Sequence, residues 1–231
     1  MIGMKRLLVM PFLLLLTGCN IKVLDSRSDT ADDQAFLIIY SFALMLVVVL
    51  VVSILFIRFV FKYRYTDERK DNIPPDVKGN KWLETAWVIG PLLLLAILAV
   101  PTIMMTYDQS PVLSTESEQE GTAVQVTAEQ FNWTFEHANG KTEQNRLVIP
   151  EGETILLHLK SEDVIHSFWV PRLGGKVDVM PDRELVYEIK NSQIGTYEGK
   201  CAEYCGLGHT NMKFEAEVVS ADAYTSYLNE K

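Results

Sequence analysis

Two uncharged apolar segments, residues 36–57 and 85–106, constrain this 231-residue chain most strongly. Each has 22 residues without Asp, Glu, Lys or Arg, and a helix needs about 20 apolar residues to cross a bilayer. Pro91 and Pro101 lie inside the second segment, where a membrane helix tolerates proline. A buried hairpin of a soluble protein is the alternative, but the uniform hydrophobicity of both segments argues against it. The sequence therefore predicts a transmembrane hairpin within residues 19–107.

The loop between the two segments predicts the orientation of the hairpin. We expect helices at about residues 35–60 and 83–107, joined by a loop at 61–82 that carries six Lys and Arg residues. Short loops rich in Lys and Arg stay in the cytoplasm. Both ends of the mature chain would then lie outside, as in a two-pass protein of the bacterial cell membrane with an extracytoplasmic C-terminal domain.

The N-terminus has the outline of a secretory signal. Lys5 and Arg6 precede an apolar run at residues 7–16, which is too short to span a bilayer. The following Leu-Thr-Gly-Cys resembles the lipobox of bacterial lipoproteins, which implies cleavage of a signal peptide at 1–18 and a lipid on Cys19. The alternatives are a signal in which the cysteine is incidental, or an uncleaved anchor.

Residues 108–231 are expected to form an all-β domain outside the membrane. Apolar residues alternate with polar ones around positions 124–128, 155–159, 185–189 and 214–218, which predicts a sandwich or barrel with one face of each strand buried. We expect a polar linker at 109–121 and a short closing helix at 221–229, capped by Ser220. The domain has 21 Asp and Glu against 10 Lys and Arg. That balance argues against nucleic acid and favours basic partners, although solubility alone would also explain it.

The stretch CAEYCGLGHTNM, residues 201–212, brings together the side chains with the most distinctive chemistry. Two thiolates, an imidazole and a thioether are soft donors, which select copper over calcium, magnesium or manganese. Zinc would accept the thiols and the histidine, but a thioether is a poor zinc ligand. A disulfide is chemically reasonable in an exported domain, whereas a c-type haem needs C-x-x-C-H, which is absent. We favour copper because His209 and Met212 follow the cysteines so closely.

A second nitrogen ligand would come from one of the three other histidines. His158 lies on the polar face of an alternating strand and is expected at the surface, and His137 precedes the turn ANGK. His166, in DVIHSFWVP, lies at the end of an apolar strand beside aromatic residues. We therefore expect His166 to join the site.

Two segments, HSFWVPRLGGKVDVMPDRE (166–184) and CAEYCGLGHTNM, resemble the copper-binding segments of subunit II of the haem-copper cytochrome c oxidases. The resemblance implies a two-helix anchor followed by a cupredoxin-like Greek-key β-sandwich or barrel that holds dinuclear copper A. It implies electron transfer from cytochrome c to this centre and on to haem in subunit I, where dioxygen is reduced. Subunit I, the other oxidase subunits and membrane lipid would be the partners. The implied copper ligands are Cys201 and Cys205 as bridges, His166 and Met212 on one copper, and His209 with the Glu203 carbonyl on the other.

The resemblance implies further roles at less distinctive positions. The carboxylates of Glu203 and Asp178 would lie near a magnesium at the contact with subunit I. Alternatively, Glu203 is a loop carboxylate and Asp178 is a turn residue. Glu84 would lie at a proton entry path. Alternatively, its carboxylate is simply favoured by its position at a helix N-terminus. Phe131 and Trp133 would mark the electron entry point; many family members have tryptophan where this chain has Phe131, which makes the entry route and the donor less certain.

Three other functions are compatible with parts of the pattern. Quinol oxidase subunits II share the fold and the anchor but lack the copper ligands. A copper A subunit of a nitric oxide reductase would share the ligands. A membrane-anchored copper carrier would need an open, exchangeable site rather than a closed set of six ligands.

Overall fold

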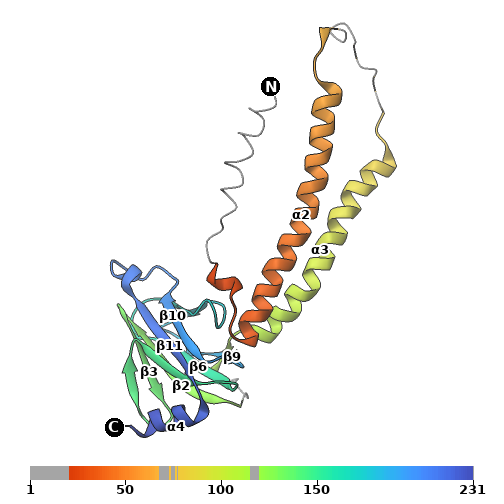
Figure 1. The fold of residues 1–231 in the computed structure, drawn as a ribbon. Helices are drawn as coiled ribbons and strands as arrows, with labels where there is room; N and C mark the ends of the chain where they lie inside the picture. Colours follow the sequence, from red (N-terminus) through yellow and green to blue (C-terminus); the bar gives the residue numbers. More distant parts are fainter. Residues whose placement is uncertain (1–20, 68–72, 74–75, 77, 115–119, 231) are drawn as a thin grey trace, which may run out of the picture. The chain divides into compact units, whose positions relative to one another are not determined.

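The computed structural model describes residues 21–67, 73, 76, 78–114 and 120–230. The described residues up to Ala35 group with Ser110–Lys231 in one compact unit, and Phe36–Gln109 form a second unit (Figure 1). The signal peptide at 1–18 and Cys19 lie outside the described residues, so cleavage and lipidation stay predictions.

Two long helices, α2 (Asp29–Tyr63) and α3 (Lys81–Gln109), account for the apolar segments. Both are long and apolar enough to cross a membrane. Each begins earlier than expected because a side chain caps its N-terminus: Ser28 Oγ accepts a hydrogen bond from Ala31 N at 3.1 Å, and Asn80 Oδ1 accepts one from Trp82 N at 3.0 Å. At 1.5 Å per residue α2 is about 52 Å long, longer than the ~30 Å hydrocarbon core of a bilayer.

The β unit has two mixed sheets. The first contains strands in the order β1 (Val112–Leu113), β9 (Leu185–Lys190), β6 (Thr154–Ser161), β2 (Thr122–Glu129), β3 (Asn132–His137) and β4 (Thr142–Gln144). The second contains β5 (Arg146–Pro150), β11 (Lys213–Val219), β10 (Gly195–Cys201), β7 (His166–Trp169) and β8 (Val177–Val179). β2 runs parallel to β6 and β5 runs parallel to β11, while the other pairs are antiparallel. The predicted β-sandwich is confirmed, and the expected linker is shorter because Val112 and Leu113 pair with β9.

One hydrophobic core joins the inward faces of both sheets. Along β2 and β11 buried and exposed positions alternate as the sequence predicts. Aromatic rings fill the region between the sheets: Phe214 of β11 lies 4.9 Å from Phe168 and 5.5 Å from Trp133, measured between ring centroids. These rings give the end of the sandwich that carries residues 201–212 a packed and rigid floor.

The closing helix α4 (Ala221–Asn229) is confirmed, and Ser220 Oγ caps it by accepting a hydrogen bond from Ala223 N at 3.3 Å. His137 is only 2% exposed and lies between two hydroxyls of this helix. Its Nδ1 is 3.1 Å from Tyr224 Oη, and its Nε2 is 3.3 Å from Tyr227 Oη. His137 therefore attaches α4 to β3 and is not a metal ligand candidate.

The segment that precedes α2 packs on the β unit. It begins with the short 3₁₀ helix η1 (Lys22–Leu24). Asp25 forms an ion pair with Arg172 at 2.7 Å, and Ser28 Oγ donates a hydrogen bond to Leu173 O at 2.6 Å. Residues 21–35, expected to belong with the hairpin, therefore help to build the β unit.

Candidate metal centre

Pairing between β7 and β10 brings the candidate ligands together. Cys201 at the end of β10 is opposite Phe168 of β7, so that His166 lies two residues further along the partner strand. Beyond the strand, the Ala202 amide donates to Ser167 O and the Cys201 amide donates to Met212 O, both at 2.9 Å. Backbone hydrogen bonds thus connect the end of β10 to β7 and to Met212, directly before β11.

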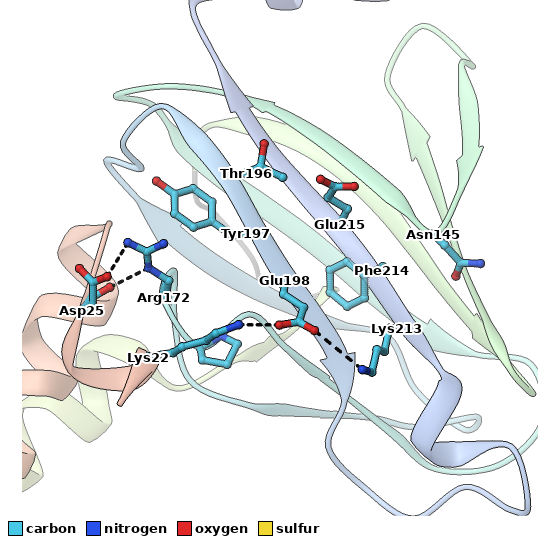
Figure 2. Close-up of a pocket in the computed structure, with 11 residues that line it drawn as sticks. Lys22, Asp25, Asn145, Arg172, Thr196, Tyr197, Glu198, Lys213, Phe214 and Glu215 are labelled. Atoms are coloured by element: carbon cyan, nitrogen blue, oxygen red, sulfur yellow. Dashed lines mark hydrogen bonds and ion pairs between the residues drawn. The ribbon is translucent and has the colours of Figure 1, made fainter. Parts of the chain in front are cut away.

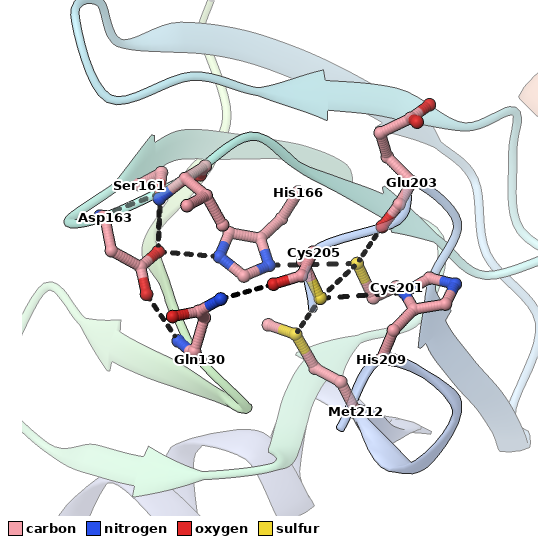
Figure 3. Close-up of polar contacts among 10 residues, drawn as sticks. Gln130, Ser161, Asp163, His166, Cys201, Glu203, Cys205, His209 and Met212 are labelled. Carbon is pink, nitrogen blue, oxygen red and sulfur yellow. Dashed lines mark hydrogen bonds and ion pairs between the residues drawn. The ribbon is translucent and has the colours of Figure 1, made fainter. Parts of the chain in front are cut away.

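The donor atoms form a continuous cluster (Figure 3). Cys201 Sγ lies 3.8 Å from Cys205 Sγ and 3.8 Å from His166 Nδ1. Cys205 Sγ lies 3.6 Å from His209 Nδ1 and 3.7 Å from Met212 Sδ. The short 3₁₀ helix η4 (His209–Asn211) carries the second histidine toward the thiols. Donors bound to one ion at about 2.0–2.3 Å lie no more than about 4.6 Å apart, so these spacings fit metal coordination.

A sixth donor comes from the backbone. The Cys201 thiol lies 3.2 Å from the carbonyl oxygen of Glu203. His166, Cys201 and Cys205 form a buried group whose ligand atoms lie within 4.8 Å of one another. Both cysteines are free thiols, which leaves them available to a metal.

The two thiols differ in acidity. Burial opposes ionisation of Cys201, but its hydrogen bonds, foremost that with His166, outweigh burial and lower the pKa. Burial and the neighbouring Cys201 raise the pKa of Cys205. Cys201 therefore forms a thiolate readily, and the negative charge of that thiolate opposes ionisation of Cys205. A bound cation would remove that opposition, which is the behaviour expected of a metal site.

Asp163 orients His166 and was not identified from the sequence. Its Oδ1 lies 2.8 Å from His166 Nε2, on the ring edge that faces away from Cys201 (Figure 3). The carboxylate thereby selects the tautomer with its proton on Nε2 and leaves the Nδ1 lone pair toward the thiols. Burial lowers the pKa of His166, but Cys201 and Asp163 outweigh it and raise the pKa overall. The only sequence signal was a carboxylate three residues before the histidine.

The loop between the cysteines and His209 is held by the turn between β2 and β3. Gln130 Nε2 donates a hydrogen bond to Cys205 O. Gly206 has φ +127°, which favours glycine, and a Cβ on Gly208 would lie 2.5 Å from the ring of Phe131. Phe131 therefore packs closely against the backbone of the ligand loop.

The structure separates the two aromatic residues expected at the electron entry point. Phe131 is partly exposed. Trp133 is 0% exposed and makes an edge contact with His166, with ring centroids 6.1 Å apart. Trp133 is therefore a core residue that supports His166, and an electron-entry role for Phe131 or Trp133 stays a prediction.

Other predicted positions lie at the surface. Lys176 Nζ is 3.6 Å from Asp178 Oδ1 and 4.0 Å from Glu203 Oε2, so an ammonium already lies between the two carboxylates expected near magnesium. Glu84 lies in the first turn of α3. His158, expected at the surface, is instead only one-fifth exposed because its Nδ1 contacts Glu184 Oε1 at 2.9 Å.

Comparison with known proteins places both units in one family. The family described as "Cytochrome C oxidase subunit II, periplasmic domain" matches residues 132–219, which include all six candidate ligands. The family described as "Cytochrome C oxidase subunit II, transmembrane domain" matches residues 17–105. This chain belongs to the cytochrome c oxidase subunit II family. It is therefore a two-pass membrane subunit of a haem-copper oxidase, with a C-terminal periplasmic domain of cupredoxin-like fold.

The similar proteins are named after two different electron donors, cytochrome c and quinol. Cytochrome c oxidase subunit 2 of Alkalihalophilus pseudofirmus is 38% identical over 97% of this chain and 67% of its own length. Quinol oxidase subunit 2 of Bacillus cereus is 33% identical over 98% of this chain and 79% of its own length. Among the similar proteins this chain spans as little as 59% of a relative's length. The crystal structure of the periplasmic domain of subunit II of cytochrome oxidase of Bradyrhizobium japonicum is 25% identical, covering 48% of this chain and 94% of that one with a TM-score of 0.46.

Proposed function

We propose that this chain is the electron-accepting subunit of a cytochrome c oxidase and that residues 166–212 hold dinuclear copper A. The observation that carries the proposal is the convergence of two free thiols, two imidazoles, a thioether and a carbonyl at spacings of 3.2–3.8 Å. Soft donors of this kind suit copper. In this assignment the coppers would be held by the thiolates of Cys201 and Cys205 together with His166, His209, Met212 and the Glu203 carbonyl.

The chain's own residues would hold the site still while its charge changes. When bound, the two coppers would accept and release one electron at a time. Cys201 and Met212 are tied through a backbone hydrogen bond. Asp163 fixes the ring of His166, and the buried Trp133 supports it from the core. Ligands that barely move keep the reorganisation energy low, which favours fast transfer.

Quinol oxidation is the second candidate, because several relatives at 30–33% identity are named quinol oxidase subunit 2 or probable quinol oxidase subunit 2. The resemblance implies that quinol oxidase subunits lack the copper ligands, and this chain has all six. We therefore favour cytochrome c as the donor. A proton entry role for Glu84 and a magnesium at Glu203 are parts of the same proposal and rest on the resemblance alone.

Replacing His166 in the intact oxidase tests the proposal. Wild type should contain two coppers per chain with a mixed-valence spectrum and should oxidise reduced cytochrome c. His166→Ala should lose that spectrum and the oxidation of cytochrome c. The matched control is His158→Gln, a histidine of β6 whose ring forms a hydrogen bond with Glu184 at 2.9 Å and is no candidate ligand, and it should retain both.

Two outcomes would contradict the assignment. An intact mixed-valence spectrum in His166→Ala would remove His166 from the ligand set. Oxidation of quinol but not of cytochrome c by a wild-type complex without copper in this chain would establish the second candidate instead.

A further inference from the structure

The two thiols of the candidate centre are held in different ways. Cys201 is the last residue of β10, and its amide donates a hydrogen bond to Met212 O at 2.9 Å. Cys205 lies in the loop before η4, outside any strand or helix, yet it is only 4% exposed. Strand pairing therefore fixes the position of Cys201, whereas the position of Cys205 depends on contacts from elsewhere in the fold.

Gln130, in the turn between β2 and β3, provides such a contact (Figure 3). Its side-chain Nε2 donates a hydrogen bond to Cys205 O. Its backbone N–H donates to Asp163 Oδ2 at 2.8 Å, and Oδ1 of the same carboxylate lies 2.8 Å from His166 Nε2. A single residue therefore connects the carboxylate that orients His166 with the backbone of Cys205.

The turn and the ligand loop also touch directly. Gly206 follows Cys205, and a Cβ at this position would lie 2.8 Å from Gln130 Nε2. The neighbouring Phe131 packs against Gly208 of the same loop. Because the two segments are in close contact, movement of one displaces the other.

Side chains on the outer face of the second sheet are engaged with one another instead. Around a hollow of about 540 Å³, Glu198 lies between two lysines, with one oxygen 2.6 Å from Lys22 Nζ and the other 3.8 Å from Lys213 Nζ (Figure 2). In the ligand loop, Glu203 Oε2 lies 4.0 Å from Lys176 Nζ, but both side chains are about half exposed, and exposed ion pairs contribute little. Among the described residues, the side chain that donates a hydrogen bond to the Cys205 carbonyl is therefore that of Gln130.

We propose that Gln130 is a positioning residue that keeps the Cys205 thiol at its distance from His166 and Cys201, an inference that rests on the proposed function. Gln130 is itself exposed, so water would replace its hydrogen bond if the amide were removed, and the β unit would stay folded. The loss would instead allow Cys205 and the loop up to Met212 to move. A ligand that is held less firmly needs more reorganisation when the charge of the centre changes, which slows electron transfer.

Hydrogen–deuterium exchange in the intact oxidase, stripped of copper by a chelator, tests the positioning role without relying on the metal. The amides of His209, Asn211 and Met212 report on the loop, because each donates a hydrogen bond within it. Gln130→Leu should increase their exchange about fivefold, as expected for the loss of one hydrogen bond.

Three further variants show whether the hydrogen bond itself is responsible. Gln130→Glu keeps the length of the side chain but has no N–H to donate, so it should increase exchange as Gln130→Leu does. Asp163→Asn releases the backbone of Gln130, so its effect combined with Gln130→Leu should be little larger than the greater of the two single effects. Gln125→Leu is the matched control, since Gln125 is an exposed residue within β2, and it should leave exchange unchanged.

The copper-loaded complex supplies the second readout. Wild type and Gln130→Leu should both contain two coppers per chain, but the hyperfine pattern of the mixed-valence spectrum should differ between them, while Gln125→Leu should match wild type. Wild-type exchange in either Gln130 variant, effects of Gln130→Leu and Asp163→Asn that simply add, or an unchanged spectrum would overturn the positioning role. Absence of copper from wild type would remove the proposed function, and the exchange results would still decide whether Gln130 positions Cys205.

Discussion

Replacing Asp163 with asparagine should weaken copper binding while leaving the ligands in place. Asp163 Oδ1 accepts from His166 Nε2 at 2.8 Å. A hydrogen bond to a charged acceptor contributes about 1.5–3 kcal/mol and one to a neutral acceptor about 0.5–1.5 kcal/mol. The difference of about 1–1.5 kcal/mol corresponds to a loss of roughly five- to tenfold in copper affinity. This loss reaches only the lower end of the 10- to 100-fold range typical of residues that orient metal ligands.

The substitution also affects folding in a way that can be measured separately. Asp163 Oδ2 accepts from the Gln130 amide at 2.8 Å, and an asparagine Nδ2 in its place would leave that donor unpaired. We expect the free energy of unfolding to fall by about 1 kcal/mol. Copper affinity is therefore determined by chelator competition on the folded full chain, with unfolding followed in a parallel experiment.

Glu162→Gln is the matched control, because Glu162 is the adjacent carboxylate and pairs only with Lys160 at 3.4 Å among the described residues. It should keep wild-type copper affinity. A copper dissociation constant for Asp163→Asn within twofold of both wild type and the control would refute the reasoning that the carboxylate acts through His166.

Two further predictions concern the β unit. His137→Phe should lower the free energy of unfolding by about 2 kcal/mol at pH 7.5, because it removes two hydrogen bonds of about 1 kcal/mol each to the tyrosines of α4. Burial lowers the pKa of His137 below 6.5, so the unfolded state takes up the proton first and wild type loses this stability as the pH falls below 6.5. The difference between the two proteins in denaturant titrations should therefore be smaller at pH 5.5, and a constant difference would contradict the assignment. Lys176→Met should increase affinity for Mn²⁺, a paramagnetic substitute for magnesium, because it removes the ammonium near Asp178 and Glu203; unchanged Mn²⁺ binding by electron paramagnetic resonance would exclude a cation site there.

Much of the fold could be predicted because the responsible signals are local. The membrane helices follow from uninterrupted apolar length, and the strands follow from alternation of period two. The exact ends were missed where a single side chain decides them, as Ser28 and Asn80 do at the helix caps. The position of residues 21–35 was missed because it depends on contacts such as Asp25 with Arg172, 147 residues away in the chain.

The candidate ligands could be predicted because five of the six lie within residues 201–212, where spacing alone restricts their geometry. Asp163, Gln130 and Lys176 could not be predicted from chemistry, because carboxylates, amides and lysines are common on any surface. Their importance depends on which strand ends meet. The burial of Trp133 could not be predicted for the same reason: its sequence neighbours do not tell whether the ring faces solvent or the core.

Amino-acid sequence by itself determined that this chain crosses a membrane twice, that its C-terminal part is a β domain, and that soft metal donors gather near its end. Hydrophobic length, alternation and close ligand spacing are short-range properties, so they can be recognised in the sequence without any knowledge of tertiary contacts. Only the tertiary structure decided the partners of those donors. The pairing of β7 with β10 brings His166 to Cys201, and the turn between β2 and β3 places the side chain of Gln130 on the carbonyl of Cys205. His166 and Cys201 are 35 positions apart in the chain, and contacts over such separations depend on how the strands pair, which no local property of the sequence specifies.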